Sequence, residues 1–311
     1  MKVLIVNHSV QNCGVYQFGK RVAGILEKSP RNEYMYLEID SEEKLLNKIQ
    51  DAKPDAIIYN HLEGTMPWVT EETVSRIRKT GIRQTLLVHN INYATFFDAY
   101  FHQNPYFKSQ DSFNFALPRP LFDYKPISRS SAKDAVMIGS FGFGFKVKHF
   151  DDLCRLVAKN FKKQKVQVNL HITESFFSPN KHVIDEIEEK CRKILKRNNQ
   201  KLVVTRNFMS DEEVLNFLAD QDLNIFLYEK YKNYNGISST IDYALSAGKP
   251  IAINKSNMFS HLSDLNPSIY VEDNKLEEII SSGTKQLDAK RQLWSNDNFY
   301  QVVDKALESL K

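Results

Sequence analysis

A short run of small and hydroxylated residues in the later part of the chain has the composition of an anion-binding helix start. The run consists of Gly236, Ile237, Ser238, Ser239 and Thr240. Apolar residues recur behind it at helical spacing, which predicts a helix that begins near position 238 and ends at Gly248. The first N–H groups of a helix lack partners within the helix, and its positive end favours negative charge. The run therefore predicts a phosphate-binding site, with an ordinary capped helix as the alternative.

A second run, rich in glycine and lysine, covers residues 139–148 and reads GSFGFGFKVK. We expect it to form a loop between a strand and a helix, where glycines let a backbone approach a ligand closely. Ser140, Lys146 and Lys148 can supply hydrogen-bond donors and positive charge to a diphosphate. The run matches neither the GxGxxG fingerprint nor a P-loop. We interpret it as a second phosphate-suited loop, and a flexible connection is the alternative.

The amino-terminal part of the chain offers further candidates. Gly14 lies in the loop after the first predicted strand, where it could bring a ligand close to the backbone or simply form a tight turn. His89 ends the predicted strand 84–88, which favours a catalytic role or, as an isolated histidine, a structural one. His61 has a similar position, and its neighbour Glu63 could act as an acid or base or begin a surface loop.

The sequence predicts no metal site and no bound cofactor. Asp220 and Asp222 match the Asp-x-Asp pattern of some metal-dependent nucleotide-sugar enzymes, but they stand at the amino end of a predicted strand, away from the ligand edge. The three cysteines are far apart and lack metal-ligand spacing, which argues against zinc and against a disulfide framework. Free cysteines suit a reducing compartment.

Short apolar strands alternate with amphipathic helices along most of the chain, which predicts parallel sheets with helical crossovers. The first set comprises predicted strands 3–7, 34–39, 56–59 and 84–88 and predicted helices 15–27, 42–49 and 71–79. The alternation lapses between residues 90 and 133, and residues 118–131 predict an interdomain linker. The second set comprises strands 135–139, 166–172, 201–205, 223–228, 250–253 and 268–271 and helices 150–160, 183–196, 211–220, 276–287 and 299–310, in addition to the helix after Gly236. The fold class is α/β, with two Rossmann-like domains facing a cleft and ligands outside the carboxyl ends of the strands.

Composition and charge are those of an ordinary soluble protein. Hydrophobic residues make up 42% and charged residues 26% of the 311 residues. The net charge of +4 is a mild excess that predicts no nucleic-acid partner and is compatible with anionic substrates or with peripheral contact to an anionic membrane surface. No apolar segment approaches membrane-spanning length, and the first strand begins where a signal peptide would stand, so we expect a cytoplasmic protein.

At four places the chain resembles the retaining, nucleotide-sugar-dependent GT-B glycosyltransferases that build bacterial surface glycans. The places are residues 3–6 with Gly14, residues 138–150, residues 205–213, and residues 236–239 followed by 244–250. The last place carries the Ala-x-x-x-Gly-x-Pro ending, which is the best match of the four. The resemblance implies an N-terminal acceptor domain over residues 1–125, a C-terminal donor domain over 126–295, and a final helix, 296–311, that can pack back on the N-terminal domain.

The chain departs from the family pattern at both of the family's glutamates, which stand eight positions apart. In the ungapped register Asn235 takes the first position and Tyr243 the second, whereas a two-residue gap would put Asn233 at the first. The family's second glutamate holds ribose hydroxyls, and the nearest acid here is Asp242. We therefore predict that Asp242 contacts the ribose, with a solvated helix residue as the alternative.

The leading hypothesis is the transfer of a sugar from a nucleoside-diphosphate donor to a glycan, a lipid-linked or a small hydroxylated acceptor. The resemblance implies metal-independent catalysis in which Lys146 and Lys148 neutralise the leaving diphosphate, with His89 contacting the transferred sugar and Asn235 at the first glutamate position. The aromatic-rich residues 93–122 could form an acceptor wall. A nucleotide-sugar epimerase on the same fold and a non-catalytic sugar-nucleotide or glycan-binding protein are the alternatives.

Overall fold

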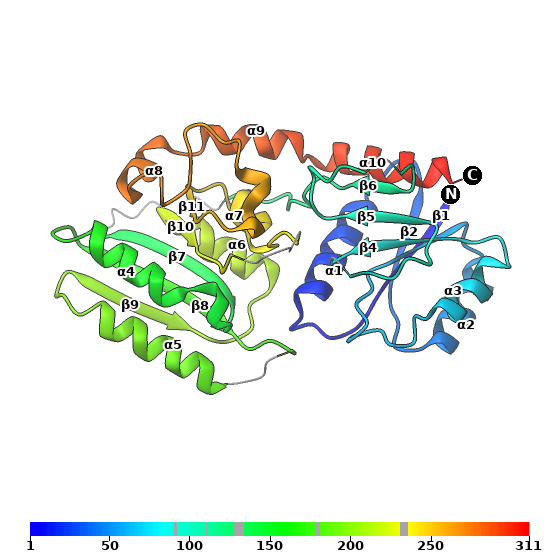
Figure 1. Cartoon of the computed structure of the whole chain (residues 1–311), viewed down its shortest axis with the longest axis horizontal. Coiled ribbons are helices and arrows are strands. Elements are labelled where there is room, and N and C mark those ends of the chain that lie inside the picture. Colours follow the sequence, from blue (N-terminus) through cyan, green and yellow to red (C-terminus); the bar gives the residue numbers. More distant parts are fainter. Residues whose placement is uncertain (90–91, 110, 127–133, 178–180, 231–235, 311) are drawn as a thin grey trace. The chain divides into compact units, whose positions relative to one another are not determined.

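The computed structural model describes residues 1–89, 92–109, 111–126, 134–177, 181–230 and 236–310 and divides into two α/β units (Figure 1). The first unit is built from Met1–Pro120 and from the carboxyl-terminal segment that starts at Leu293. The second unit takes up most of the chain between Leu121 and Gln292. Each unit has its own parallel sheet, and each is described by itself.

Six parallel strands form the sheet of the first unit, in the order β2-β1-β3-β4-β5-β6. The strands are β1 (Lys2–Asn7), β2 (Glu33–Glu38), β3 (Ala56–Tyr59), β4 (Arg83–Val88), β5 (Ala99–His102) and β6 (Asn114–Ala116). The helices are α1 (Gly14–Leu26), α2 (Glu42–Ala52), α3 (Glu71–Arg78) and α10 (Asn296–Ser309). This strand order is the flavodoxin-like variant of the doubly wound fold, and the connections change direction between β1 and β3.

The alternation of side chains along β1 divides the core of this unit between the two faces of the sheet. Val3 and Ile5 pack with Phe18 of α1 and Phe299 of α10 on one face. Leu4 and Val6 belong to a second buried cluster on the other face, with Leu45 of α2 and Val74 of α3.

Helix α10 contacts the rest of the first unit through hydrogen bonds as well as through apolar packing. Asp304 is fully buried and accepts hydrogen bonds from the Tyr34 hydroxyl at 2.6 Å, from the Asn32 side chain at 2.6 Å and from the Ser29 hydroxyl at 3.2 Å. The last helix of the chain therefore completes a unit whose other elements all lie within the first 120 residues.

Five parallel strands form the sheet of the second unit, in the order β11-β10-β7-β8-β9. The strands are β7 (Val136–Phe143), β8 (Val166–Thr173), β9 (Gln200–Thr205), β10 (Leu223–Phe226) and β11 (Ile251–Ile253). The α-helices are α4 (Phe150–Asn160), α5 (Lys181–Ile194), α6 (Asp211–Ala219), α7 (Thr240–Ala247), α8 (Leu276–Ser282) and α9 (Lys285–Leu293). Two 3-10 helices complete the list, η1 (Lys146–Lys148) and η2 (Asn257–Leu262). Counted from β7, the order is that of a Rossmann sheet, with the change of direction between β7 and β10.

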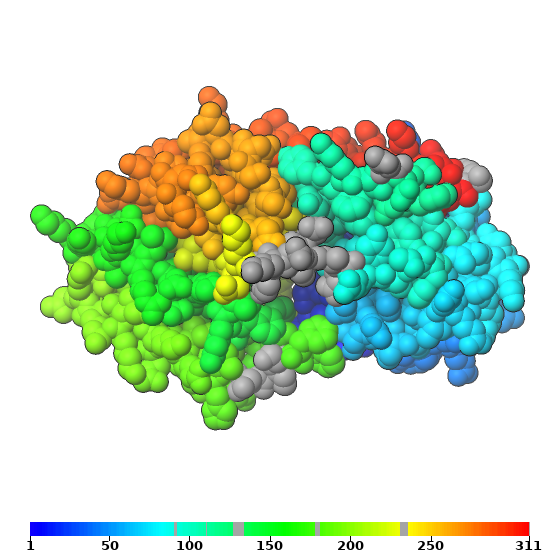
Figure 2. All heavy atoms as spheres, in the orientation of Figure 1, coloured from blue at the N-terminus to red at the C-terminus, as the bar shows by residue number. Residues whose placement is uncertain are grey.

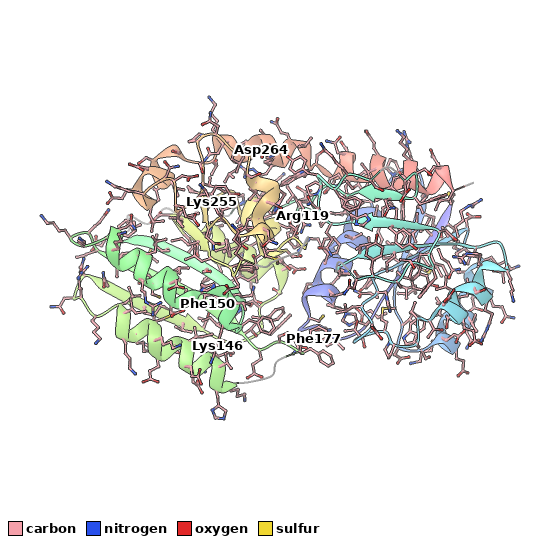
Figure 3. All side chains as sticks on the ribbon, in the orientation of Figure 1. Arg119, Lys146, Phe150, Phe177, Lys255 and Asp264 are labelled. Atoms are coloured by element: carbon pink, nitrogen blue, oxygen red, sulfur yellow. The ribbon has the colours of Figure 1, made fainter. Side chains whose placement is uncertain are left out.

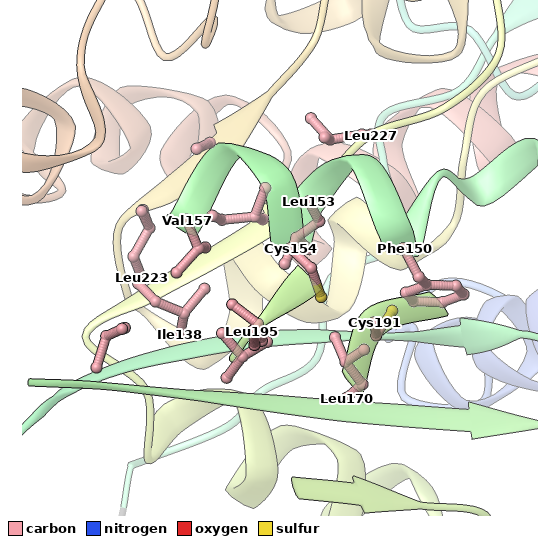
Figure 4. Close-up of a cluster of buried hydrophobic side chains, with 14 of the residues drawn as sticks. Ile138, Phe150, Leu153, Cys154, Val157, Leu170, Cys191, Leu195, Leu223 and Leu227 are labelled. Atoms are coloured by element: carbon pink, nitrogen blue, oxygen red, sulfur yellow. The ribbon is translucent and has the colours of Figure 1, made fainter. Parts of the chain in front are cut away.

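The core of the second unit lies between its sheet and the helices α4 and α5 (Figure 4). Phe150 and Cys154 of α4 and Cys191 of α5 are buried against Ile138 of β7 and Leu170 of β8. The outer sides of α4 and α5 contribute to the green surface of this unit in the space-filling view (Figure 2). The cysteines are free and serve as small apolar residues.

The α/β class and the alternation of strands and helices are confirmed, and four expectations about elements are wrong. Residues 268–271 form no strand, and only Tyr270 makes an isolated bridge, with Ile253. The region where the alternation lapses contains β5 and β6. Residues 139–143 are part of β7 and not of a loop. The helix predicted over 276–287 is two helices, because Gly283 between them adopts φ of 65°, which a helix cannot continue.

Gly248 caps α7 in the left-handed conformation, with φ of 68°, as predicted. Among the described residues, no helix combines the length and the apolarity that crossing a bilayer requires.

Candidate functional site

A lysine, a tyrosine and two hydroxyl residues meet beside the carboxyl ends of β7 and β10. The ammonium group of Lys148, in η1, donates a hydrogen bond to the hydroxyl of Tyr228, two residues after β10, and lies 4.5 Å from the centroid of the tyrosine ring. The Tyr228 hydroxyl is 3.1 Å from Oγ1 of Thr240, which is 2.8 Å from Oγ of Ser238. These four residues, here called the Lys148 cluster, join η1 to the first residue of α7.

The electrostatics of the Lys148 cluster favour an anionic ligand. Burial by itself would raise the pKa of the Tyr228 phenol, but the charge of Lys148 and the hydrogen bonds from Lys148, Ser238 and Thr240 lower that pKa below its ordinary value. An ammonium group has three N–H donors, so Lys148 keeps two beyond the one that Tyr228 accepts. These two donors are available to an oxygen anion while the contact with Tyr228 is kept.

The start of α7 adds backbone donors to the cluster. Ser239 at its N-cap makes no side-chain cap bond; Oγ of the neighbouring Ser238 accepts a hydrogen bond from the N–H of Thr240 at 3.4 Å, and Asp242 stands in the first turn. Backbone N–H groups at a helix start and the positive end of the helix attract phosphate. The predicted helix therefore begins at Thr240, and the phosphate-binding character of residues 236–240 stays a prediction.

Gly142 makes room for the lysine. Its φ of 150° is one that side-chain-bearing residues rarely adopt, and a Cβ atom built on it would lie 2.6 Å from Nζ of Lys148. Glycine at this position in β7 thus lets the ammonium group lie against the strand backbone.

The two predicted lysines lie in different surroundings. Lys146, labelled in Figure 3, forms an exposed ion pair with Glu186 of α5, at 2.8 Å. Ser140 is 3% exposed, inside β7 and in register with Leu170, so its expected position in a loop is wrong. The alternation of glycine with phenylalanine over 139–145 is a strand pattern, because phenylalanine favours strands and β7 uses every second position for one face.

For the other residues predicted to bind the nucleotide-sugar donor, that role stays a prediction. Asp242 is fully buried in α7, where its carbonyl oxygen accepts a hydrogen bond from Ser246 at 2.6 Å. Ile237 is buried and Gly236 is half-buried in a segment without regular structure. Asn235 and Asn233 lie outside the described residues.

In the first unit, His89 belongs to a network of buried amides at the carboxyl edge of the sheet. Its Nε2 lies 2.7 Å from Oδ1 of Asn60, and its Nδ1 lies 2.5 Å from Nε2 of Gln103. Asn60, directly after β3, donates to Oδ1 of Asn7 at 2.7 Å and to the carbonyl of Val15 at 2.8 Å. These bonds fix the identity of the Asn60 oxygen, because a backbone carbonyl can only accept.

The network dictates the protonation of His89. Since the Asn60 oxygen accepts, Nε2 of His89 carries the proton, and the bond from Gln103 to Nδ1 then completes a neutral ring. Desolvation, followed by the proximity of His61, His8 and Arg119, lowers the pKa of His89 to about 3. Both ring nitrogens are engaged, so the geometry favours a fixed neutral ring over a proton carrier.

The other candidates of the first unit lie along the same edge. Gly14 is the exposed first residue of α1, and Cys13 before it makes no side-chain cap bond. His61 and Glu63, which follow β3, line a cavity together with His89. Burial lowers the pKa of His61.

Asp222 lies at the amino edge of the second sheet, as predicted, where it accepts a hydrogen bond from the backbone of Met137 at 2.8 Å. Within the described ranges, no group of three or more histidine, cysteine, aspartate or glutamate side chains is arranged to hold a metal ion.

Comparison with solved structures gives the class of fold first. The neighbours include GT-B glycosyltransferases, and the chain has their two-domain α/β fold. No family profile and no curated protein matches the sequence.

Three solved structures illustrate the likeness, at identities that establish the fold alone. Anabaena Alr3699/HepE, in complex with UDP and glucose, is 15% identical, with a TM-score of 0.65 over 99% of this chain and 100% of that one. The lipopolysaccharide outer core galactosyltransferase WaaB, in its apo form, is 11% identical, with a TM-score of 0.59 over 99% of each chain. The N-terminal domain of Candida albicans trehalose-6-phosphate phosphatase is 12% identical, with a TM-score of 0.61 over 100% of this chain and 97% of that one.

Proposed function

We propose that this protein is a glycosyltransferase that transfers a sugar from a nucleoside-diphosphate donor to a hydroxyl group of a glycan, a lipid-linked or a small acceptor. The observation that carries the proposal is the Lys148 cluster at the start of α7. It lies at the carboxyl edge of a Rossmann sheet, where such sheets bind their ligands. The solved structures of HepE with UDP and of HepE with UDP-glucose support this choice, because they have the same fold.

In the proposed reaction the glycosidic oxygen leaves as part of a nucleoside diphosphate, and negative charge grows on that diphosphate as the bond breaks. Lys148 stabilises this charge through its two remaining N–H donors, and the first N–H groups of α7 add a fixed positive dipole. Tyr228 holds the ammonium group in place, so little reorganisation is needed when the charge develops.

We further propose that the reaction is independent of metal ions and retains the anomeric configuration of the sugar. In this scheme Lys148 supplies the positive charge that a divalent cation would otherwise supply to the diphosphate. His89 stays a proposed contact of the transferred sugar, as a neutral ring that takes no part in proton transfer. Asn235 and Asp242 belong to the proposal as further contacts to the sugar donor, whereas Lys146, which is exposed and paired with Glu186, does not.

The test is turnover of UDP-glucose with a panel of glycans and alkyl glycosides, by UDP release and by product mass. Transfer that persists in excess EDTA and gives an α-linked product by NMR is the expected result. Lys148→Ala should abolish turnover, whereas Lys193→Ala, which removes an exposed lysine paired with Glu189 on α5, should not. Donor hydrolysis or epimerisation without transfer, or UDP binding without any turnover, would overturn the proposal.

A further inference from the structure

A cavity of about 540 Å³ lies at the carboxyl edge of the first sheet, between the connections that follow β3 and β4. Its size falls within the usual range of small-molecule sites. The wall is mixed. Apolar and aromatic contributors are Leu62, Pro67, Val69, Leu86, Leu87, Tyr93, Ala94 and Phe96, and polar contributors are His61, Glu63, Thr70, Glu71, His89 and Asn92.

The charged groups that line this cavity are all of one sign. Among its described lining residues, Glu63 and Glu71 are the charged side chains, and lysine and arginine are absent. The histidines add no positive charge at neutral pH, because burial lowers the pKa of His61 and lowers that of His89 to about 3. The cavity is therefore acidic in a chain whose net charge is +4.

The helix that begins at the cavity does not provide an anion site. Thr70 caps α3 by accepting a hydrogen bond from the backbone of Thr73 at 3.2 Å, and Glu71 follows in the first turn. The side-chain oxygen and the carboxylate already occupy the role that a phosphate would have at this helix start.

Two arginines of α3, the helix that begins at the cavity, are engaged elsewhere. Arg76 of α3 pairs with Glu42 at 3.1 Å and with Glu72 at 3.0 Å. Arg78 pairs with Asp98 at 2.7 Å and donates to the carbonyl of Phe96 at 2.5 Å. Recruiting either arginine to a phosphate would first require breaking these pairs.

We infer that the group seated in this cavity is an uncharged sugar and not a phosphate- or carboxylate-bearing one. This inference rests on the proposed function, for which it specifies the acceptor. Hydroxyl groups can hydrogen-bond to Glu63, Asn92 and Thr70, while the apolar face of a sugar ring packs against Tyr93 or Phe96. An anion would meet the carboxylates of Glu63 and Glu71. Arg119, the cation near His89, does not line the cavity; it is fully buried and donates to the carbonyl of Gln103 at 2.7 Å.

The experiment titrates the full chain, without donor, with two probes that differ by a phosphate: glucose and glucose 6-phosphate. Binding is followed at pH 7.5 through the ring resonances of His61, assigned by their loss in His61→Gln. We expect saturable shifts with glucose and an affinity at least tenfold weaker for glucose 6-phosphate. The histidine readout is local, so phosphate bound in the second unit does not enter the measurement.

Charge reversal gives the decisive comparison. Glu63→Lys should narrow or invert the preference between the two probes. Glu189→Lys changes the net charge equally on exposed α5 and should leave the preference unchanged. Equal or tighter binding of glucose 6-phosphate at His61 in the unaltered chain, or no shift with glucose, would overturn the inference. Glucose binding here without turnover of UDP-glucose would overturn the proposed function alone.

Discussion

The hydroxyl of Tyr228 stands between the ammonium group of Lys148 and Oγ1 of Thr240, and so connects two segments that lie 92 positions apart. Lys148 follows β7 and Thr240 begins α7, so neither segment could hold the other without a buried intermediary. Tyr228 is 6% exposed and receives the positive charge both on its oxygen and over its ring. The lysine is thus oriented by a buried residue that stands two positions after a strand of the sheet.

Tyr228→Phe should lower turnover of the donor while leaving the fold intact. The substitution keeps the aromatic ring beside Lys148 but removes the hydroxyl that accepts a hydrogen bond from the ammonium group. A hydrogen bond to a charged group is worth about 1.5–3 kcal/mol, so we expect a loss in kcat of roughly tenfold or more. The measurement is steady-state kinetics with UDP-glucose.

Tyr270→Phe is the matched control for this substitution. Tyr270 is also a buried tyrosine of the second unit, with Nζ of Lys255 5.7 Å from its ring centroid, but that lysine is paired with Asp273. Its variant should retain full turnover. Equal kinetic constants for Tyr228→Phe and Tyr270→Phe would show that the Tyr228 hydroxyl does not contribute to turnover.

Lys148→Ala should weaken UDP binding far more than Lys146→Ala. Lys148 belongs to the cluster at the start of α7, whereas Lys146 is 63% exposed and engaged with Glu186. An exposed ion pair contributes at most about 1 kcal/mol, and its loss barely affects a remote site. Isothermal titration with UDP measures both variants. A larger loss for Lys146→Ala would mean that the diphosphate lies beside α5.

His89 should remain neutral, with its proton on Nε2, far below the ordinary histidine pKa. Asn60 and Gln103 bond to both ring nitrogens, and desolvation lowers the pKa to about 3. Nitrogen chemical shifts report the tautomer directly, and the resonance is assigned by its loss in His89→Gln. A protonated ring at pH 5, or the proton on Nδ1, would contradict the network described above.

The lowered pKa of His89 makes the free energy of unfolding depend on pH. The folded-state pKa is depressed, so the unfolded chain binds a proton first as the pH falls below 6.5. Stability from this group is complete above pH 6.5 and declines toward pH 3, by about 1.4 kcal/mol per pH unit once the unfolded state is protonated. Urea unfolding at pH 7 and pH 5 should therefore show a smaller acid loss for His89→Gln than for the unaltered chain.

Two glycines of α1 should respond oppositely to the same substitution. A Cβ on Gly19 would overlap the side chain of Asn60, which is fully buried, whereas a Cβ on Gly24 would meet nothing within 4 Å. Gly24→Ala should raise the free energy of unfolding by about 0.5–1 kcal/mol through helix propensity. Gly19→Ala should lower it by about 1–3 kcal/mol because the interior is overpacked. If urea unfolding finds the two variants equally stable, the Asn60 side chain must move to make room for the methyl group.

The sequence predicted the elements whose residues carry a strong period and clear ends. Helix α4 was predicted at its observed bounds, because Asp151 and Asp152 mark its first turn and its apolar residues recur every three or four positions. Strand β5 was missed because its four residues stand among aromatics and prolines, where a short buried strand has no distinguishing period.

The candidate site was predicted in part, and the missed residues share a physical reason. Lys148, Ser238 and Thr240 are chemically suggestive types, so composition and position were enough to select them. Tyr228 is significant only through contacts with segments distant in sequence, and a single sequence does not reveal such contacts. Gly142 lies within the predicted glycine-rich run, but the room that it makes for Lys148 depends on the fold. Asn60 and Gln103 were missed for the same reason, since their role is to orient His89.

The placement of α10 determines the order in which the molecule can be completed during synthesis. Phe299, Val303 and Leu307 fill one face of the first sheet, but they leave the ribosome only after the whole second unit has been made. At about 5–20 residues per second, the intervening segment takes roughly ten to thirty seconds to synthesise. During that interval the nascent first unit exposes the apolar face that α10 later covers, on α1 and β1. The core of the first unit is therefore complete only after the second unit has been synthesised.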